Sequence, residues 1–210
     1  MSKLYLVDGL GLWSEVINNT DNFTNKPAIF IDRDGTYIED CGYISDPKKV
    51  KLIESSCLFI KKCNDANIPV IVVTNQSGIA RGYFTWDDFS NIEKVIREFL
   101  KRQNVCLDMV CACGYYEGGN KKYRIDKELW RKPHPGMINE AEKKLNINLS
   151  KSWIIGNSSS DIEAGRNAGL AGGIFLNKEK EEKRIFNNFK VYEKSKLVDM
   201  DWLVKKLRVE

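Results

Sequence analysis

The chain has 210 residues, of which 42% are hydrophobic and 30% are charged, and its formal net charge is +4. This composition is typical of a globular protein with its own core, and the charge is too small to indicate a nucleic-acid surface. No apolar stretch approaches the roughly 20 residues of a membrane span, and the first residues lack the apolar core of a signal peptide. We therefore expect a cytoplasmic protein with no nucleic-acid or membrane partner.

The six cysteines are scattered through predicted helices and strands. This distribution favours reduced, mostly buried thiols over a disulfide framework. Residues 1–26 hold an apolar segment followed by a stretch rich in Asn and Thr, which predicts a loop. We treat residues 1–26 as an N-terminal extension without an assigned role and expect residues 27–210 to form a single domain.

An apolar run over residues 28–31 predicts the first strand of the domain, buried on both faces as in a parallel sheet. Asp32 and Asp34 follow it, and both carboxylates leave on the same side if the chain stays extended. Two carboxylates so close together repel each other unless a cation lies between them, which indicates a Mg²⁺ site. The alternative is a strand that ends in a polar turn, where Asp forms local backbone hydrogen bonds.

Strands and helices alternate along the rest of the chain. Further strands are predicted over residues 68–74, 107–113, 153–156 and 173–176, and helices over residues 53–66, 85–102, 135–145, 159–168 and 198–207. Residues 36–47 and 114–130 are too irregular for either element and predict long loops, and the charge run 178–184 predicts a solvated helix face. The alternation predicts an α/β fold with a doubly wound, mainly parallel, Rossmann-like sheet.

Polar side chains collect after four of the predicted strands. They are Asp32 and Asp34, then Thr74 and Asn75, the turn over residues 131–135, and the segment 157–161. Because open α/β sheets bind ligands beyond the carboxyl ends of their strands, these groups are expected to converge on one face. This convergence is the main argument for an enzyme.

The residue types suit phosphoryl transfer. Asp32 can accept a phosphoryl group as a carboxylate nucleophile, and Asp34 can protonate the leaving oxygen and later deprotonate water. Thr74 offers a hydroxyl and Lys132 a positive charge for the phosphoryl oxygens. Asn157, Asp161 or both would complete the Mg²⁺ site.

Several of these residues also have a purely structural explanation. Thr74 suits a strand end or a helix cap, and Lys132 could be an ordinary surface charge. Asp161 suits the first turn of a helix, where the helix dipole favours a negative charge. His134, the only histidine, lies between two prolines in a turn, and we interpret it as structural because the carboxylates already supply acid and base.

Four segments resemble the four motifs of the haloacid dehalogenase (HAD) superfamily of phosphatases. They are Asp32-Arg33-Asp34-Gly35-Thr36, the segments 74–82 and 131–137, and Gly156-Asn157 with Asp161. The strings TNQSGIARG and RKPHPGM are specific for the branch that acts on D-glycero-D-manno-heptose 1,7-bisphosphate and on histidinol phosphate. The resemblance covers about residues 28–177 and implies minimal caps, so the two long loops would determine substrate specificity.

The resemblance also implies a role for each matching residue. It implies Asp32 as nucleophile, Asp34 as acid and base, Thr74 and Lys132 as phosphate ligands, and Asn75, Arg81, Arg131 and Lys132 as substrate-binding residues. Mg²⁺ would be bound by Asp32, by the backbone carbonyl of Asp34 and by Asn157, with Asp161 in support.

Two departures from the family pattern matter. Asn157 stands where the family has Asp, which removes one negative charge from the metal site. The branch usually holds a structural Zn²⁺ in a loop through four Cys and His ligands, but the matching segments here, 113–115 and 128–130, keep only Cys113. Because a closed tetrahedral site needs all four ligands, we expect no zinc.

The expected function is removal of the 7-phosphate of the heptose bisphosphate, a step toward nucleotide-activated heptose for surface polysaccharide. An alternative enzyme acts on histidinol phosphate or another small phosphate ester. An alternative of another class is a catalytically weakened binding or scaffold protein, which Asn157 and the lost zinc ligands favour. Against it, Asp32, Asp34, Thr74 and Lys132 are all present. We expect a monomer whose partner is a small phosphorylated sugar.

Overall fold

The computed structural model describes residues 5–18, 23–124, 128–176, 183–186 and 189–208, and these contain one eight-stranded sheet. Its strand order is β1-β4-β3-β2-β5-β6-β8-β7. The strands are β1 (Leu12–Val16), β2 (Ile29–Ile31), β3 (Val70–Asn75), β4 (Met109–Cys113), β5 (Trp153–Gly156), β6 (Gly172–Leu176), β7 (Lys183–Phe186) and β8 (Phe189–Lys194). Only the two edge strands pair antiparallel, β1 with β4 and β7 with β8. The prediction of a mainly parallel α/β sheet is confirmed.

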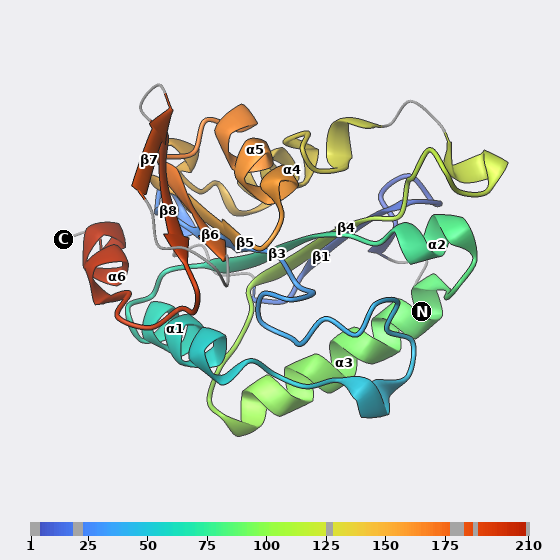
Figure 1. The fold of residues 1–210 in the computed structure, drawn as a ribbon, viewed down its shortest axis with the longest axis horizontal. Coiled ribbons are helices and arrows are strands. Elements are labelled where there is room, and N and C mark those ends of the chain that lie inside the picture. Colours follow the sequence, from blue (N-terminus) through green and yellow to red (C-terminus); the bar gives the residue numbers. More distant parts are fainter. Residues whose placement is uncertain (1–4, 19–22, 125–127, 177–182, 187–188, 209–210) are drawn as a thin grey trace.

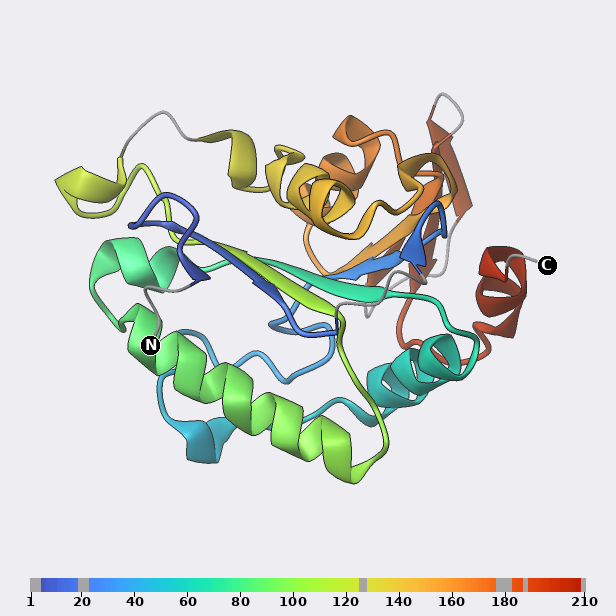
Figure 2. The same ribbon diagram turned by 180° about the vertical axis from the view of Figure 1, so that it is seen from behind.

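Helices cover both faces of the sheet, with α1 and α3 on one face and α4 and α5 on the other (Figures 1 and 2). The helices are α1 (Glu54–Asp65), α2 (Ser77–Arg81), α3 (Trp86–Arg102), α4 (Gly136–Leu145), α5 (Ser159–Asn167) and α6 (Asp201–Leu207). Single 3₁₀ turns are η3 (Pro47–Lys49), η4 (Lys121–Tyr123), η5 (Glu128–Trp130) and η6 (Leu149–Lys151). Among the described residues, no helix combines the length and the apolar character that a bilayer crossing requires.

Local sequence accounts for the elements that position the strand ends. Four consecutive β-branched residues of β3, starting at Val70, are fully buried, as expected for an interior parallel strand. The helix α3 begins with a capping box, in which the Thr85 side chain accepts a hydrogen bond from the Asp88 amide and the Asp88 carboxylate caps Thr85 in return. In α5, Gly165 lies so close to β5 that a Cβ there would be 2.5 Å from the Ile154 side chain. The helix therefore packs tightly on β5.

The N-terminal segment has a structural role that the sequence analysis did not assign. Residues 12–16 form β1, which pairs antiparallel with β4 and so extends the sheet at one edge. Trp13 is fully buried, and its indole ring stacks on Trp86 at 5.6 Å between centroids. This part of residues 1–26 is thus built into the sheet and into the core beneath α3.

Near the other end of the chain the predictions fail in two places. Lys183 and Arg184 belong to β7, so the expectation of a helix face is wrong there, while residues 178–182 lie outside the described part. The strand β8 was not predicted at all. Its residues alternate between buried and half-buried, but one of the buried positions is Glu193, which breaks the apolar alternation that marks a strand.

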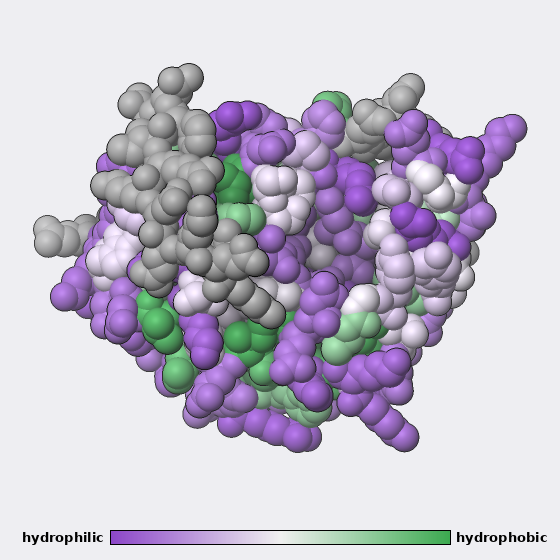
Figure 3. Space-filling view, in the orientation of Figure 1, coloured by the Kyte–Doolittle hydropathy of each residue, from purple (hydrophilic) through white to green (hydrophobic). Residues whose placement is uncertain are grey.

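The surface is predominantly polar on the face seen in Figure 3. Hydrophobic residues form separate small areas there rather than one continuous patch. Scattered apolar residues of this kind are normal on a globular protein. The expectation of a monomer stays a prediction.

Candidate active site

Three neighbouring strands bring the predicted site residues together. β2 lies between β3 and β5 and is parallel to both, so the residues that follow these strands lie side by side. The amide of Asp32 donates to the Ile155 carbonyl at 2.9 Å, which continues the pairing of β2 with β5 by one residue. Asp32, Thr74 and Asn157 therefore lie at the same edge of the sheet, as expected from the parallel topology.

Lys132 occupies the centre of this edge and is almost completely buried. Its ammonium group lies 2.6 Å from each of three acceptors, which are Asp32 Oδ1, Asp161 Oδ1 and the Val73 carbonyl. A lysine ammonium has three protons, so each acceptor can take one. The interpretation of Lys132 as a surface charge is therefore wrong.

The charges in this cluster are strongly coupled. Burial raises the pKa of Asp32 to about 7; Lys132 opposes this rise, and the negative charges of Asp161 and Asp34 add to it. Burial lowers the pKa of Lys132, but the carboxylates of Asp161 and Asp32 outweigh this effect and raise it. The lysine therefore stays positively charged between two acidic groups, as a buried cation requires.

Asp161 has the structural role that the sequence allowed, at the start of a helix, and it also pairs with Lys132, while its part in a Mg²⁺ site stays a prediction. Its Oδ2 accepts the amide proton of Ser158 at 2.9 Å and so completes a capping box at the start of α5. Its Oδ1 faces Lys132. Gly156 is required beside it, since a Cβ there would lie 2.2 Å from Asp161 Oδ2. The helix cap thus holds this carboxylate against the lysine.

Asp34 is held by side chains that the sequence analysis did not single out. The guanidinium of Arg33 donates from Nε to Asp34 Oδ2 and from Nη2 to Oδ1, both at 3.1 Å. Gln76 Nε2 donates to Asp34 Oδ2 at 2.9 Å and to Thr74 Oγ1 at 2.8 Å. Gln76 therefore links the predicted acid and base to the predicted phosphate ligand.

Arg33 is itself buried and paired with a second acid. Its Nη1 donates to Glu93 Oε1 of α3 at 3.1 Å, and both side chains are at most 2% exposed. Its guanidinium also lies over the ring of Phe89, 5.1 Å from the centroid. The only sequence signal was the position of Arg33 between two aspartates, because Glu93 lies 60 residues away.

We expect Arg33→Met to destabilise the fold by about 3–5 kcal/mol, because Glu93 would be left as an unpaired buried charge. Burial raises the pKa of Glu93 and Arg33 opposes that rise, so loss of the arginine removes the compensation. In Arg33→Met/Glu93→Met, stability should recover to within about 1 kcal/mol of the unmodified protein while phosphatase activity stays low. Urea unfolding and phosphate release measure the two effects.

The matched control for this prediction is Arg102→Met, since Arg102 is exposed at the end of α3 and lies over the ring of Phe99. Its unfolding free energy should change by less than about 1 kcal/mol. Equal stability of Arg33→Met and the control would contradict the assignment of a buried charge network around Arg33.

Asn75 is fully engaged with the segment that carries Lys132. Its Nδ2 donates to the Lys132 carbonyl, and its Oδ1 accepts from the Lys132 amide, both at 3.1 Å. These two bonds fix the backbone beside the buried ammonium group. Substrate binding by Asn75 stays a prediction, and its side chain positions Lys132.

Two arginines converge on one aromatic ring beside the cluster. The guanidinium carbon of Arg81 lies 4.3 Å from the centroid of Tyr116, and that of Arg131 lies 5.0 Å from it. Arg131 lines a cavity of about 210 Å³ together with residues from the loop after β4 and from the turn after Arg131: Tyr115, Tyr116, Glu117, Tyr123, Arg124, Lys132, Pro133 and His134. This cationic cavity next to Lys132 fits an anionic ligand.

The oxygen groups at the edge also fit a hard divalent cation. Lys132 engages only Oδ1 of Asp32, and no hydrogen bond to its Oδ2 is formed within the described ranges. Asn157 is exposed, and its amide covers Gly35 so closely that a Cβ on Gly35 would lie 2.2 Å from Asn157 Nδ2. The described residues hold no group of three or more His, Cys, Asp or Glu that could bind a metal. A metal here would thus need the amide and backbone oxygens as well.

The cysteines near the loop after β4 lie inside the sheet. Cys111 and Cys113 are buried on β4, and burial raises the pKa of the Cys113 thiol to about 11. The segments 113–115 and 128–130 offer no second thiol and no imidazole beside Cys113. The expectation of no zinc stays a prediction.

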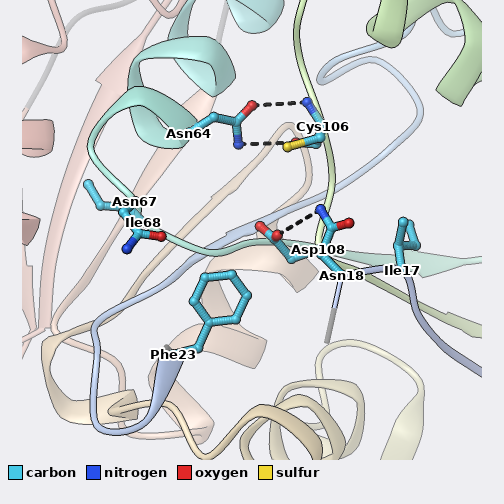
Figure 4. A pocket seen from close by; sticks show the side chains of 8 residues that line it. All are labelled: Ile17, Asn18, Phe23, Asn64, Asn67, Ile68, Cys106 and Asp108. Carbon is cyan, nitrogen blue, oxygen red and sulfur yellow. Dashed lines mark hydrogen bonds between the residues drawn. The ribbon is translucent and has the colours of Figure 1, made fainter. Parts of the chain in front are cut away.

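A larger cavity lies at the opposite end of the strands, where β3 and β4 begin (Figure 4). It has a volume of about 400 Å³ and contains Asp108 and Asn64. Asp108 accepts from the Val70 amide and from Asn18, and Asn64 exchanges two hydrogen bonds with the Cys106 backbone. The polar side chains of Asp108 and Asn64 are thus already paired within the protein.

The fold and the site together define a class of protein, an α/β protein with an acidic, lysine-centred site at the carboxyl end of its middle strands. Residues 129–189 match a family model described as HAD-hydrolase-like. The chain is 44% identical over 169 residues to a D-glycero-beta-D-manno-heptose-1,7-bisphosphate 7-phosphatase of Mesorhizobium japonicum, covering 80% of this chain and 78% of that protein. A phosphatase of the same name from Haemophilus influenzae is 32% identical, covering 86% and 98%.

Solved structures agree with these sequence matches. A HAD-like phosphatase from Mesorhizobium loti superposes with a TM-score of 0.91 at 38% identity and covers 98% of both chains. A D,D-heptose 1,7-bisphosphate phosphatase from B. bronchiseptica, in complex with magnesium and phosphate, superposes with a TM-score of 0.63 at 26% identity, covering 71% and 79%. The chain belongs to the HAD superfamily of phosphatases, so the predictions of the family and of a phosphoric monoester hydrolase are confirmed.

Proposed function

We propose that this enzyme hydrolyses a sugar phosphate through an aspartyl-phosphate on Asp32, with Mg²⁺ as cofactor. The observation that carries the proposal is the position of Asp32, whose Oδ1 is fixed 2.6 Å from the Lys132 ammonium while Oδ2 remains available. Attack by that oxygen on phosphorus forms an acyl phosphate and releases the sugar alkoxide, and water then cleaves the acyl phosphate. The carboxylate is regenerated in the second step.

The neighbouring side chains have matching roles in the proposed cycle. Asp34 would donate a proton to the leaving sugar oxygen and later take a proton from the attacking water. Arg33 and Gln76 keep its carboxylate in one orientation, which favours a single productive geometry. Thr74 and Lys132 would bind the phosphoryl oxygens, where negative charge collects in the transition state.

Mg²⁺ would be held by Asp32, by the backbone carbonyl of Asp34 and by Asn157, with Asp161 in support. When bound, the cation supplies charge neutralisation between the nucleophile and the incoming phosphate. Lys132 supplies only one positive charge to Asp32 and Asp161, so the acidic edge still has a net negative charge to offset. A magnesium and phosphate complex of a structural relative supports the same cofactor here.

The proposed substrate is D-glycero-D-manno-heptose 1,7-bisphosphate, from which the enzyme removes the 7-phosphate. The names of the relatives support this choice. The cavity beside Lys132 supports it too, because Arg81 and Arg131 at Tyr116 offer positive charge for the second phosphate of a bisphosphate. The reaction would serve nucleotide-heptose and surface polysaccharide synthesis in the cytoplasm.

Phosphate release tests the proposal directly. Both anomers of the heptose bisphosphate, histidinol phosphate and p-nitrophenyl phosphate are assayed with Mg²⁺ and with a chelator. We expect the largest kcat/KM for one heptose anomer, with loss of the 7-phosphate seen by ³¹P NMR. A larger kcat/KM for histidinol phosphate would overturn the heptose assignment, and full activity with the chelator would overturn the metal requirement.

Asn157→Asp is expected to lower the Mg²⁺ concentration for half-maximal activity by about threefold to tenfold. The change restores a full negative charge at the metal site, and such a charge near a protein surface contributes on the order of 1 kcal/mol or more. A magnesium titration of activity measures the effect. Ser159→Asp on the exposed start of α5 serves as the control for a nonspecific charge. An Asn157→Asp midpoint equal to that of the unmodified protein would argue against Asn157 as a ligand.

A further inference from the structure

The N-terminal segment is bonded to the loop that follows β4. In Figures 1 and 2 the dark blue N-terminal segment lies beside the end of β4 and the yellow-green loop. Its turn over residues 8–11 is closed by Asp8, whose Oδ1 accepts the amide protons of Leu10 and Gly11 at 3.0 and 2.9 Å. The same oxygen accepts from the Leu12 amide at 3.1 Å. One carboxylate oxygen thus organises the whole turn.

The second oxygen of Asp8 points out of the turn to the loop. Its Oδ2 accepts the hydroxyl proton of Tyr115, whose side chain is 3% exposed. The backbones also meet, since the Gly114 amide donates to the Gly11 carbonyl at 2.8 Å. Gly11 leaves no room for a side chain, because a Cβ there would lie 2.6 Å from the Tyr115 ring. The turn and Tyr115 therefore fit together closely.

The helix α3 also contacts the turn over residues 8–11. The indole of Trp86 donates to the Leu10 carbonyl at 2.7 Å, and the Trp86 ring stacks on the buried Trp13 of β1. The turn is therefore fixed to the core as well as to the loop. Burial alone would raise the pKa of Asp8, but the hydrogen bonds from Tyr115 and the turn amides outweigh this effect and lower it to about 2. Asp8 is therefore a carboxylate that accepts these bonds.

Tyr115 also connects to the candidate substrate cavity. Its backbone carbonyl accepts a hydrogen bond from Arg131 Nη1 at 3.2 Å, and the next residue, Tyr116, carries the ring over which Arg81 and Arg131 lie. Asp8 therefore holds the side chain of the residue whose backbone holds Arg131. Arg131 in turn precedes the buried Lys132.

We propose that Asp8 and Tyr115 are positioning residues for substrate binding. The turn over residues 8–11 fixes Tyr115, and Tyr115 fixes Arg131 at the cavity. The kinetic part of this inference rests on the proposed function. We call the contacts from Asp8 through Tyr115 to Arg131 the positioning path. Loss of a contact in this path should weaken binding of a substrate that reaches Arg131 and leave the chemistry at Asp32 unchanged. The N-terminal segment would then be an integral part of the substrate site.

Tyr115→Phe tests the path, because it removes the hydroxyl and keeps the ring. We expect KM for the heptose bisphosphate to rise about threefold to tenfold with kcat within twofold, as for the loss of one hydrogen bond. For p-nitrophenyl phosphate, which lacks a second phosphate for Arg131 to bind, KM should rise less than for the heptose bisphosphate. Asp8→Ala should act in the same direction and more strongly. Tyr5→Phe, in the same segment and packed on Trp13, is the matched control and should have no effect.

A double-mutant cycle separates positioning from general destabilisation. If Tyr115 acts through Arg131, Tyr115→Phe should have no further effect on KM in an Arg131→Ala background. An equal rise of KM in both backgrounds, or unchanged KM in Tyr115→Phe, would overturn the proposal.

Hydrogen exchange of residues 114–123 gives a readout that needs no substrate. We expect faster exchange in Asp8→Ala and Tyr115→Phe than in Tyr5→Phe. Faster exchange together with no turnover of the heptose bisphosphate by the unmodified enzyme would support the path and refute the proposed substrate. Unchanged exchange would refute the path whatever the substrate is.

Discussion

Asp32→Asn should reduce phosphate release by a factor of about 10³ or more, because an amide cannot serve as the nucleophile that forms an acyl phosphate. The fold should survive the change. Asparagine has nearly the same shape, and its amide oxygen can still accept a hydrogen bond from Lys132 in place of Asp32 Oδ1. Initial rates of phosphate release and thermal unfolding measure the two properties on the same preparation.

Asp108→Asn is the matched control for the nucleophile. Asp108, which Figure 4 shows beside Asn18, is also a buried aspartate, but it lies at the opposite end of the strands, where it accepts from the Val70 amide. Its replacement should lower the unfolding free energy by about 1 kcal/mol, which corresponds to a few degrees in melting temperature. The value of kcat should stay nearly unchanged. A comparable loss of activity in both variants would show that burial rather than nucleophilicity explains the effect at Asp32.

Lys132→Met should reduce both activity and stability. Loss of a preorganised positive charge at the phosphoryl oxygens typically costs a factor of about 10² to 10³ in kcat. At pH 8 and without added metal, we expect the unfolding free energy to fall by about 3–5 kcal/mol, since Asp32 and Asp161 would lose their shared cation. Urea unfolding in the presence of a chelator measures this difference.

The loss of stability should depend on pH in a defined direction. Burial raises the pKa of Asp32 in the folded protein to about 7, above its ordinary value, and Lys132 opposes that rise. A carboxyl group with a raised folded pKa binds more protons in the folded state, so stability falls as the pH rises between the two values. Without Lys132 the folded pKa of Asp32 rises further. The part of the difference that arises from Asp32 should therefore be small near pH 5 and grow toward pH 8, while the part that arises from Asp161 remains at both pH values.

Lys62→Met provides the control for the loss of a lysine. Lys62 forms an exposed ion pair with Asp201, and exposed pairs contribute at most about 1 kcal/mol. Its unfolding free energy should show no trend between pH 5 and pH 8 relative to the unmodified protein. A pH-independent effect of Lys132→Met would contradict the account of a charge-coupled cluster.

The convergence of the site residues could be predicted from the sequence because it follows from the sheet. Parallel strands end at one edge, so the polar residues after β2, β3 and β5 had to meet. The start of α3 was also predictable, since Thr85 and Asp88 form a capping box from residues only three positions apart. The capping box is a local sequence signal, and the shared edge depends only on the order and direction of the strands.

The support behind the site could not be predicted, because it depends on contacts between distant residues. Arg33 stands next to Asp34 and pairs with it, but nothing nearby in the sequence shows that Glu93, 60 residues away, meets the same guanidinium. β1 was missed for the same reason. A segment that looks like a loop-rich leader becomes a strand only because β4 offers it an edge.

If Asp32 carries the phosphoryl group during turnover, the phosphorylated enzyme can be trapped and identified. The enzyme is mixed with the heptose bisphosphate and Mg²⁺, quenched in acid within milliseconds, digested and examined by mass spectrometry. We expect a phosphorylated peptide with the modification on Asp32, formed and lost at rates compatible with turnover. Active enzyme with no phosphorylated peptide, or with the phosphoryl group on another residue, would contradict this role of Asp32.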